Sequence, residues 1–153
     1  MPGARETRIL PYSAEQMFDL VADVGSYSEF LPWVVATRVR SNSDTEMVAD
    51  MLVGFKAIRE KFTSKVVKNR PERLNVRYID GPLKDLDNSW AFRPHEEGCA
   101  VDFCVEFSFR NRVFERLAGQ YFDRALRRMI EAFEQRAHDL YGEVTTAETS
   151  LRQ

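Results

Sequence analysis

A long run near the end of the chain carries apolar side chains at every third or fourth position. The run extends from Asn111 to Tyr141, and this spacing places the apolar side chains on one face of an α-helix. Gly142 follows the run directly and is a typical helix stop. The pattern therefore predicts one amphipathic helix about 45 Å long. Its apolar face must cover another part of the fold.

Upstream of this run the apolar period changes to two, the period of a half-buried strand. Alternation predicts a first strand over Arg5 to Leu10 and a series of strands between Trp33 and Phe109. Turns rich in Gly, Pro, Asn and Asp separate them, as expected for antiparallel neighbours. The most regular alternation is that of Val101, Phe103, Val105, Phe107 and Phe109.

A short helix is expected after the first strand, because Ser13 and Gln16 have the spacing of a capping box. The order of elements then predicts an α+β fold. In this fold a curved antiparallel sheet of six to seven strands wraps around the long C-terminal helix. We expect one domain over residues 1–142 and a disordered tail over residues 143–153, which show no apolar period.

Composition and charge indicate which kinds of ligand the protein could bind. The chain has 44% hydrophobic residues and eleven Phe, which favours a large apolar interior, either a filled core or a cavity. A net charge of −2 gives no overall field to attract DNA. A local arginine row remains, which is either a solvated helix face paired with acids such as Glu131 and Glu134 or a binding surface for RNA or anionic lipid. The arginine row consists of Arg110, Arg112, Arg116, Arg124, Arg127 and Arg128.

The sequence predicts an intracellular protein. No apolar run approaches the roughly 20 residues that span a bilayer, and the N-terminus lacks the apolar core of a signal peptide. We expect a cytoplasmic location, or a peripheral one at the inner face of the membrane. Cys99 and Cys104 lie five residues apart in one predicted strand, so their side chains point to opposite faces and cannot bridge each other. We expect both thiols to be reduced and structural.

Motifs that carry chemistry are missing from the sequence. Neither His95 nor His138 has a cysteine or second histidine at metal-ligand spacing. The chain shows no phosphate-binding loop, nucleophile elbow or paired-carboxylate signature. These observations predict no metal, no catalytic residue and no cofactor, and hence a protein that is not an enzyme.

Several motifs resemble, in the same order, those of the coenzyme Q-binding, START-like proteins of the polyketide cyclase superfamily. The first is Tyr12 to Val24, followed by Tyr27 and by Phe30-Leu-Pro-Trp33. The later ones are Gly81-Pro-Leu83, Leu86, Trp90, Phe92, Val101-Asp-Phe103 and Glu106-Phe-Ser-Phe109. The resemblance implies a helix-grip fold with an apolar cavity between the sheet and the long helix.

The resemblance also implies three alternative functions. In the first, the cavity holds ubiquinone as a carried ligand and the protein supports respiration. In the second, the chain acts like a ribosome association toxin, which binds the large subunit and blocks subunit joining. A third, drawn from the superfamily alone, is a cyclase or dehydrase that acts on polyketide-like substrates.

A quinone carrier needs an apolar tunnel and a mouth, and candidates for both can be named. The alternative for each candidate is a place in a filled core. Candidate lining from the strands is Phe55, Phe62, Tyr78, Trp90, Phe103 and Val105, and from the helix Leu117, Tyr121, Ala125 and Met129. Candidates for the mouth are Phe30, Leu31, Pro32 and Trp33, together with Gly81, Pro82 and Leu83.

Overall fold

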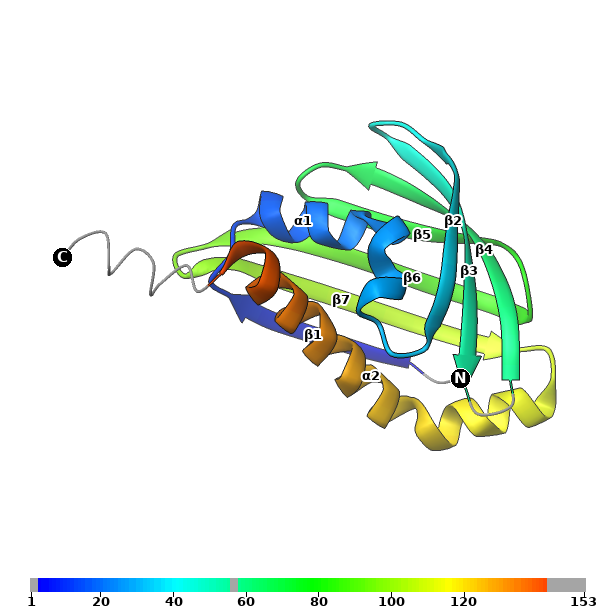
Figure 1. The fold of residues 1–153 in the computed structure, drawn as a ribbon. Coiled ribbons are helices and arrows are strands. Elements are labelled where there is room, and N and C mark those ends of the chain that lie inside the picture. Colours follow the sequence, from blue (N-terminus) through cyan, green and yellow to red (C-terminus); the bar gives the residue numbers. More distant parts are fainter. Residues whose placement is uncertain (1–2, 56–57, 143–153) are drawn as a thin grey trace.

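The computed structural model describes residues 3–55 and 58–142 of the 153-residue chain. These residues form an α+β fold in which one seven-stranded sheet curls around the long helix (Figure 1). The helix-grip prediction is thereby confirmed. The tail predicted at residues 143–153 lies outside the described residues, and the domain boundary at residue 142 stays a prediction. The elements are β1 (Gly3–Leu10), α1 (Ala14–Ala22), η1 (Val24–Glu29), β2 (Val34–Asn42), β3 (Glu46–Phe55), β4 (Ile58–Asn69), β5 (Arg73–Asp80), β6 (Leu83–His95), β7 (Gly98–Phe109) and α2 (Arg112–Tyr141).

The sheet has the strand order β1-β7-β6-β5-β4-β3-β2, and every neighbouring pair is antiparallel. Strands β2 to β7 therefore follow one another as a meander, and β1 adds to the free side of β7. In Figure 1 the sheet is strongly curved, and α1, η1 and α2 lie within its curve. The curvature lets one helix cross the apolar face of the whole sheet.

One end of the fold is a filled core. The helix α1 starts with the predicted capping box, since the Ser13 Oγ accepts from the Gln16 N–H at 3.0 Å and the Ser13 N–H donates to Gln16 Oε1 at 2.9 Å. Phe18 of α1 packs edge-on against Phe92 of β6, with ring centroids 5.7 Å apart. Ala137 of α2 is fully buried nearby, within the same cluster. This end fixes α1, the sheet and the last turns of α2 to one another.

The two ends of α2 differ in burial. The helix begins after Asn111, whose backbone is extended and whose Oδ1 accepts from the N–H groups of Val113 and Phe114 at 2.8 and 3.2 Å. The sequence pattern placed the start of the helix at Asn111. In the structure Asn111 is the N-cap, and the first helical residue is Arg112. The helix ends at Tyr141, as predicted. Its buried side chains all lie from the middle of the helix onward: Leu126, Ile130, Phe133 and Ala137.

Both cysteines are free and buried, in agreement with the prediction. Burial raises the pKa of the Cys99 thiol to about 11. Because the thiolate is the reactive form of cysteine, Cys99 is a core side chain and not a nucleophile.

Candidate ligand-binding site

An apolar cavity of about 370 Å³ lies inside the curve of the sheet; we call it the inner chamber. Strands β3 to β7 supply its floor, and Met129 and Phe133 of α2 contribute to the opposite wall. In its wall Trp90 packs against Phe103 and Phe133, with ring centroids 4.5 and 5.3 Å apart. The space under the helix is therefore hollow beyond the filled core.

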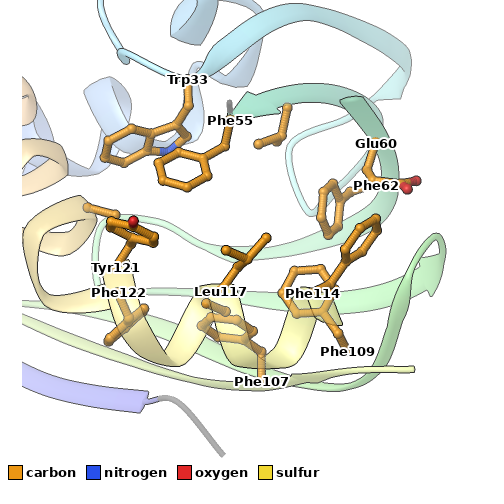
Figure 2. Close-up of a pocket in the computed structure, with 13 residues that line it drawn as sticks. Trp33, Phe55, Glu60, Phe62, Phe107, Phe109, Phe114, Leu117, Tyr121 and Phe122 are labelled. Atoms are coloured by element: carbon orange, nitrogen blue, oxygen red, sulfur yellow. The ribbon is translucent and has the colours of Figure 1, made fainter. Parts of the chain in front are cut away.

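A second apolar cavity of about 200 Å³, the outer chamber, lies under the N-terminal half of α2 (Figure 2). The helix contributes Phe114, Leu117, Ala118, Tyr121, Phe122 and Ala125 to its wall. The two chambers share lining residues and thus adjoin each other. The shared residues are Trp33, Val53, Phe62, Phe107 and Phe109.

Aromatic rings from both sides face the outer chamber. Figure 2 shows Trp33, Phe55 and Phe62 opposite Tyr121 and Leu117 of the helix. The rings of Phe55 and Tyr121 have centroids 5.5 Å apart, those of Phe107 and Phe122 5.4 Å, and those of Phe109 and Phe114 5.8 Å. Such walls suit an apolar chain or a flat ring and offer few hydrogen bonds.

Polar side chains in the two chambers are few. Glu60 is the one carboxylate among the described residues that line them, and it lies in the outer chamber. In the inner chamber Asn88 donates from Nδ2 to the carbonyl oxygen of Cys104 at 2.9 Å. The Tyr27 hydroxyl donates to the carbonyl oxygen of Val21, and burial raises the pKa of the Tyr27 phenol well above its usual value. In the part of the chain that the structure describes, no group of His, Cys, Asp or Glu could hold a metal ion.

The structure brings most of the candidate site residues together. The inner chamber is lined by Leu31, Leu83, Trp90, Phe103, Val105 and Met129, the outer one by Phe55, Leu117, Tyr121 and Ala125, and both by Trp33 and Phe62. That any of these side chains contacts a ligand stays a prediction. Phe30, Tyr78 and Pro82 line neither chamber, and the mouth candidates Pro32 and Gly81 also lie outside both.

Phe30, Tyr78 and Pro82, the three candidate site residues outside the chambers, each have another partner. Phe30 packs edge-on against Phe133 at 5.3 Å and lies under the guanidinium of Arg136. The Tyr78 hydroxyl accepts from the Leu83 N–H at 2.9 Å, which turns the phenol toward the turn between β5 and β6. The Pro82 carbonyl accepts from the Arg110 N–H at 3.1 Å. These side chains shape the ends of elements and do not face the chambers.

Some lining residues were not among the candidates. They include Phe107 and Phe109 of β7 and Phe114 and Phe122 of α2. The signal for them was present, because the first two continue the alternation of Phe103 and the last two share the apolar stripe of the helix.

The arginine row is exposed to solvent. Within the described residues none of its six members forms an ion pair, and Glu134 instead lies 3.9 Å from Arg8 of β1. The alternative in which the arginine row forms ion pairs with Glu131 and Glu134 is therefore not seen in the described part of the structure. The row lies on α2 and just before it, where acidic residues such as Asp123 and Glu131 alternate with the arginines.

Comparisons with known proteins agree with this architecture. The family described as "Polyketide cyclase / dehydrase and lipid transport" matches residues 10–134. The "Ribosome association toxin RatA" of Rickettsia prowazekii is 34% identical over 144 residues, which cover 92% of this chain and 99% of that protein. The mitochondrial "Coenzyme Q-binding protein COQ10 homolog B" of Xenopus laevis is 34% identical over 142 residues, covering 90% of this chain and 58% of that protein.

A solved structure of a STAR-related lipid transfer protein from Xanthomonas axonopodis shows the same fold. Its TM-score is 0.76 at 13% identity, and the match covers 89% of this chain and 85% of the other. Identity at this level supports the fold alone. Among the described residues, no helix has the length and apolar character needed to cross a bilayer.

Proposed function

The chain belongs to the polyketide cyclase / dehydrase and lipid transport family, and we propose that it is a non-enzymatic carrier of a prenylated quinone, ubiquinone, in support of respiration. The observation that carries this proposal is the pair of adjoining apolar chambers under α2. Their sizes, about 200 and 370 Å³, together fall within the usual range for small-molecule sites, roughly 300 to 1,000 Å³. The relative that is named coenzyme Q-binding supports the choice of ligand.

The shape of the site favours a long ligand with a small head. Two adjoining chambers that share Trp33 and Phe62 in their walls suit a flexible isoprenoid chain that extends from one into the other. Ubiquinone resides in membranes, so its carrier must meet a membrane surface to load and unload. A cytoplasmic protein that visits the inner face of the membrane fits this requirement.

The small number of polar side chains in the lining of the two chambers favours binding over catalysis. A cyclase or dehydrase needs a positioned acid or base at the substrate. In the described part of the two chambers the single carboxylate is Glu60, and it has no second acid or histidine beside it in the lining. The cyclase alternative therefore has less support than the carrier.

Organic extraction of protein purified from its native cells, followed by mass spectrometry, tests the carrier proposal. We expect ubiquinone in wild-type extracts. Ala118→Trp should abolish it, because Ala118 lines the outer chamber and an indole would fill that space. The matched control is Gln120→Trp, which adds the same side chain on the exposed face of the same helix. Repeated absence of quinone from the wild type, with no binding on addition, would refute the proposal.

A second candidate function is association with the large ribosomal subunit through the arginine row. Relatives named ribosome association toxins and the exposure of the arginine row support it, since exposed arginines attract RNA phosphates. Reversal of Arg124, Arg127 and Arg128 to Glu should abolish co-sedimentation with large subunits. The control makes the same charge change at exposed positions of the sheet, Arg38, Arg73 and Arg77. Equal sedimentation of both triple variants would remove this function.

A further inference from the structure

The sheet opens between β5 and β6. Only four pairs of residues join these strands, from Arg73 with Ala91 to Val76 with Asn88. Beyond Val76, β5 continues alongside β4, and the first residues of β6 pair with β7 alone. A hollow, which we call the wedge, separates the two strands there. Val76, Leu86 and Asn88 line both the wedge and the inner chamber, so the two hollows adjoin each other at this point.

Asn88 lies where the inner chamber meets the wedge. Its Nδ2 donates to the Cys104 carbonyl oxygen at 2.9 Å, and this hydrogen bond fixes the plane of the amide. The second N–H and the Oδ1 then remain for another partner. Asn88 is half-buried, and no described side chain has a buried polar atom without a partner, so an Oδ1 without a protein donor is open to solvent or a ligand. On the chamber side the lining residues beside Asn88, namely Val76, Leu86, Trp90 and Val105, are apolar or aromatic. The wedge side also carries charged side chains, those of Arg77, Lys84, Asp85 and Asp87.

Resting on the proposed function, we infer that Asn88 binds the polar ring of the quinone, so that the ligand lies ring inward with its isoprenoid chain in the outer chamber. The amide can donate to a ring carbonyl of the oxidised quinone and accept from a hydroxyl of the reduced form. Water that enters through the wedge can solvate the other ring oxygens. The cost of burying a polar ring is thereby reduced.

The reverse orientation is unfavourable. A ring in the outer chamber would lie beside Glu60, the one carboxylate among the described lining residues. An ionised carboxylate only accepts hydrogen bonds, and the oxygens of an oxidised quinone are also acceptors. The aromatic walls around Phe55 and Tyr121 suit the hydrocarbon chain instead. Ser64, the other small polar side chain of the inner chamber, lies on β4, two strands away from Asn88.

The test compares a quinone with a hydrocarbon. Ubiquinone with two isoprene units and squalene, which has no polar ring, each displace a fluorescent lipid probe from the purified protein. Asn88→Leu should lower the affinity for the quinone about tenfold, as expected for a lost hydrogen bond in an apolar site, and leave the affinity for squalene unchanged or higher. Asn75→Leu is the matched control. It lies on β5 beside the same strand pairing but lines neither chamber. Because Asn75 lines the wedge, Asn69→Leu is a second control, since Asn69 is exposed at the end of β4 and lines neither the chambers nor the wedge.

The outcomes separate the inference from the proposed function. Wild-type protein that binds neither compound refutes the carrier itself. Wild-type protein that binds the quinone, with an Asn88→Leu variant that binds it equally well or loses both compounds equally, overturns the ring-inward inference alone.

A second measurement does not depend on the stability of the Asn88 variant. A quinone ring quenches the fluorescence of an indole that it contacts. Trp90 lies two residues from Asn88 on the same face of β6, and Trp33 lies where the chambers meet. Ring-inward binding predicts that the quinone quenches Trp90 in the Trp33→Phe variant more strongly than Trp33 in the Trp90→Phe variant. The opposite order overturns the inference.

Discussion

Phe55 at the end of β3 and Tyr121 in the N-terminal half of α2 face each other across the outer chamber, with ring centroids 5.5 Å apart (Figure 2). The contact joins the sheet to the part of α2 that precedes Leu126, the first buried side chain of the helix. It is therefore a contact that can break without disturbing the filled core at the other end of the fold.

We expect Phe55→Ala to speed the release of bound quinone. An aromatic pair contributes about 0.5 to 1.5 kcal/mol beyond burial, so the release rate should rise roughly three- to tenfold. Stopped-flow transfer of quinone to acceptor vesicles measures it. Val113→Ala serves as the control, since Val113 is 62% exposed on the same helix and should not affect release. An unchanged rate in Phe55→Ala would place the exit elsewhere.

Gly119 in α2 should be replaceable with a gain in stability. A Cβ built at this position has nothing within 4 Å, and glycine within a helix costs roughly 0.5 to 1 kcal/mol relative to alanine. Gly119→Ala should thus raise the free energy of unfolding in urea by about that amount without changing quinone affinity.

Gly98→Ala should have the opposite effect on stability. Gly98 has a φ of +142°, and a Cβ there would lie 2.2 Å from the Leu10 carbonyl oxygen. The variant should be strongly destabilised, because both the backbone conformation and the space exclude a side chain. Equal urea midpoints for the two glycine variants would contradict this account of their surroundings.

Alternation along β7 was sufficient to predict much of the chamber wall. Phe103 and Val105 were expected on the inward face and line the inner chamber, and Phe107 and Phe109 continue the same period into both chambers. Such a period carries this information because successive side chains of a strand point to opposite faces. The alternation does not reveal whether the space between the sheet and the helix is hollow or filled.

The apolar alternation along a strand does not predict features that depend on hydrogen bonding between particular residues. Tyr78 shares the alternation of Leu74 and Val76, yet its phenol binds the Leu83 N–H. The wedge could not be predicted either, because an alternating strand looks the same whether its backbone groups are paired or not. The place of Asn88 at the junction of wedge and chamber depends on this loss of pairing. It became visible only in the structure.

Asp102 should make the fold sensitive to acid. Arg93 donates to its carboxylate at 2.6 and 3.1 Å, and Thr7 at 2.7 Å, so that three strands are joined on the outer face of the sheet. The hydrogen bonds from Arg93, with a smaller contribution from Thr7, hold the pKa of Asp102 below its usual value of 3.8. A carboxyl group with a lowered folded pKa stabilises the fold fully above its unfolded pKa. This contribution is lost as the pH falls through the folded pKa.

The free energy of unfolding should therefore fall as the pH is lowered from about 5 toward 2. The decline should be shallower in Asp102→Asn, which cannot titrate at this position. Arg93→Ala, which removes the largest cause of the shift, should also reduce the slope. Part of the slope will remain in both variants, since hydrogen bonds from Arg70 and Thr63 lower the pKa of Asp19 and Asp50 in the same way. Urea unfolding at a series of pH values measures the slopes, and identical slopes in wild type and Asp102→Asn would contradict the assignment.

The two halves of α2 should respond differently to the same substitution. Phe133 is 5% exposed and packs edge-on against Tyr27, Phe30 and Trp90, so Phe133→Ala should cost about 3 to 5 kcal/mol of unfolding free energy. Phe114 is half-buried, with one ring neighbour, Phe109, at 5.8 Å. Phe114→Ala should lower the free energy of unfolding by well under half as much as Phe133→Ala does. It should nevertheless weaken quinone binding, because it widens the outer chamber.

Urea unfolding and quinone titration of both variants separate the two contributions. The C-terminal half of the helix closes the core, so loss of Phe133 should be seen in stability, and also in binding because Phe133 lines the inner chamber. Because the N-terminal half covers a hollow, its loss should be seen mainly in binding and release. Similar stability losses at Phe114 and Phe133 would mean that the whole helix is a core element, and the outer chamber would then have no separate role in holding a ligand.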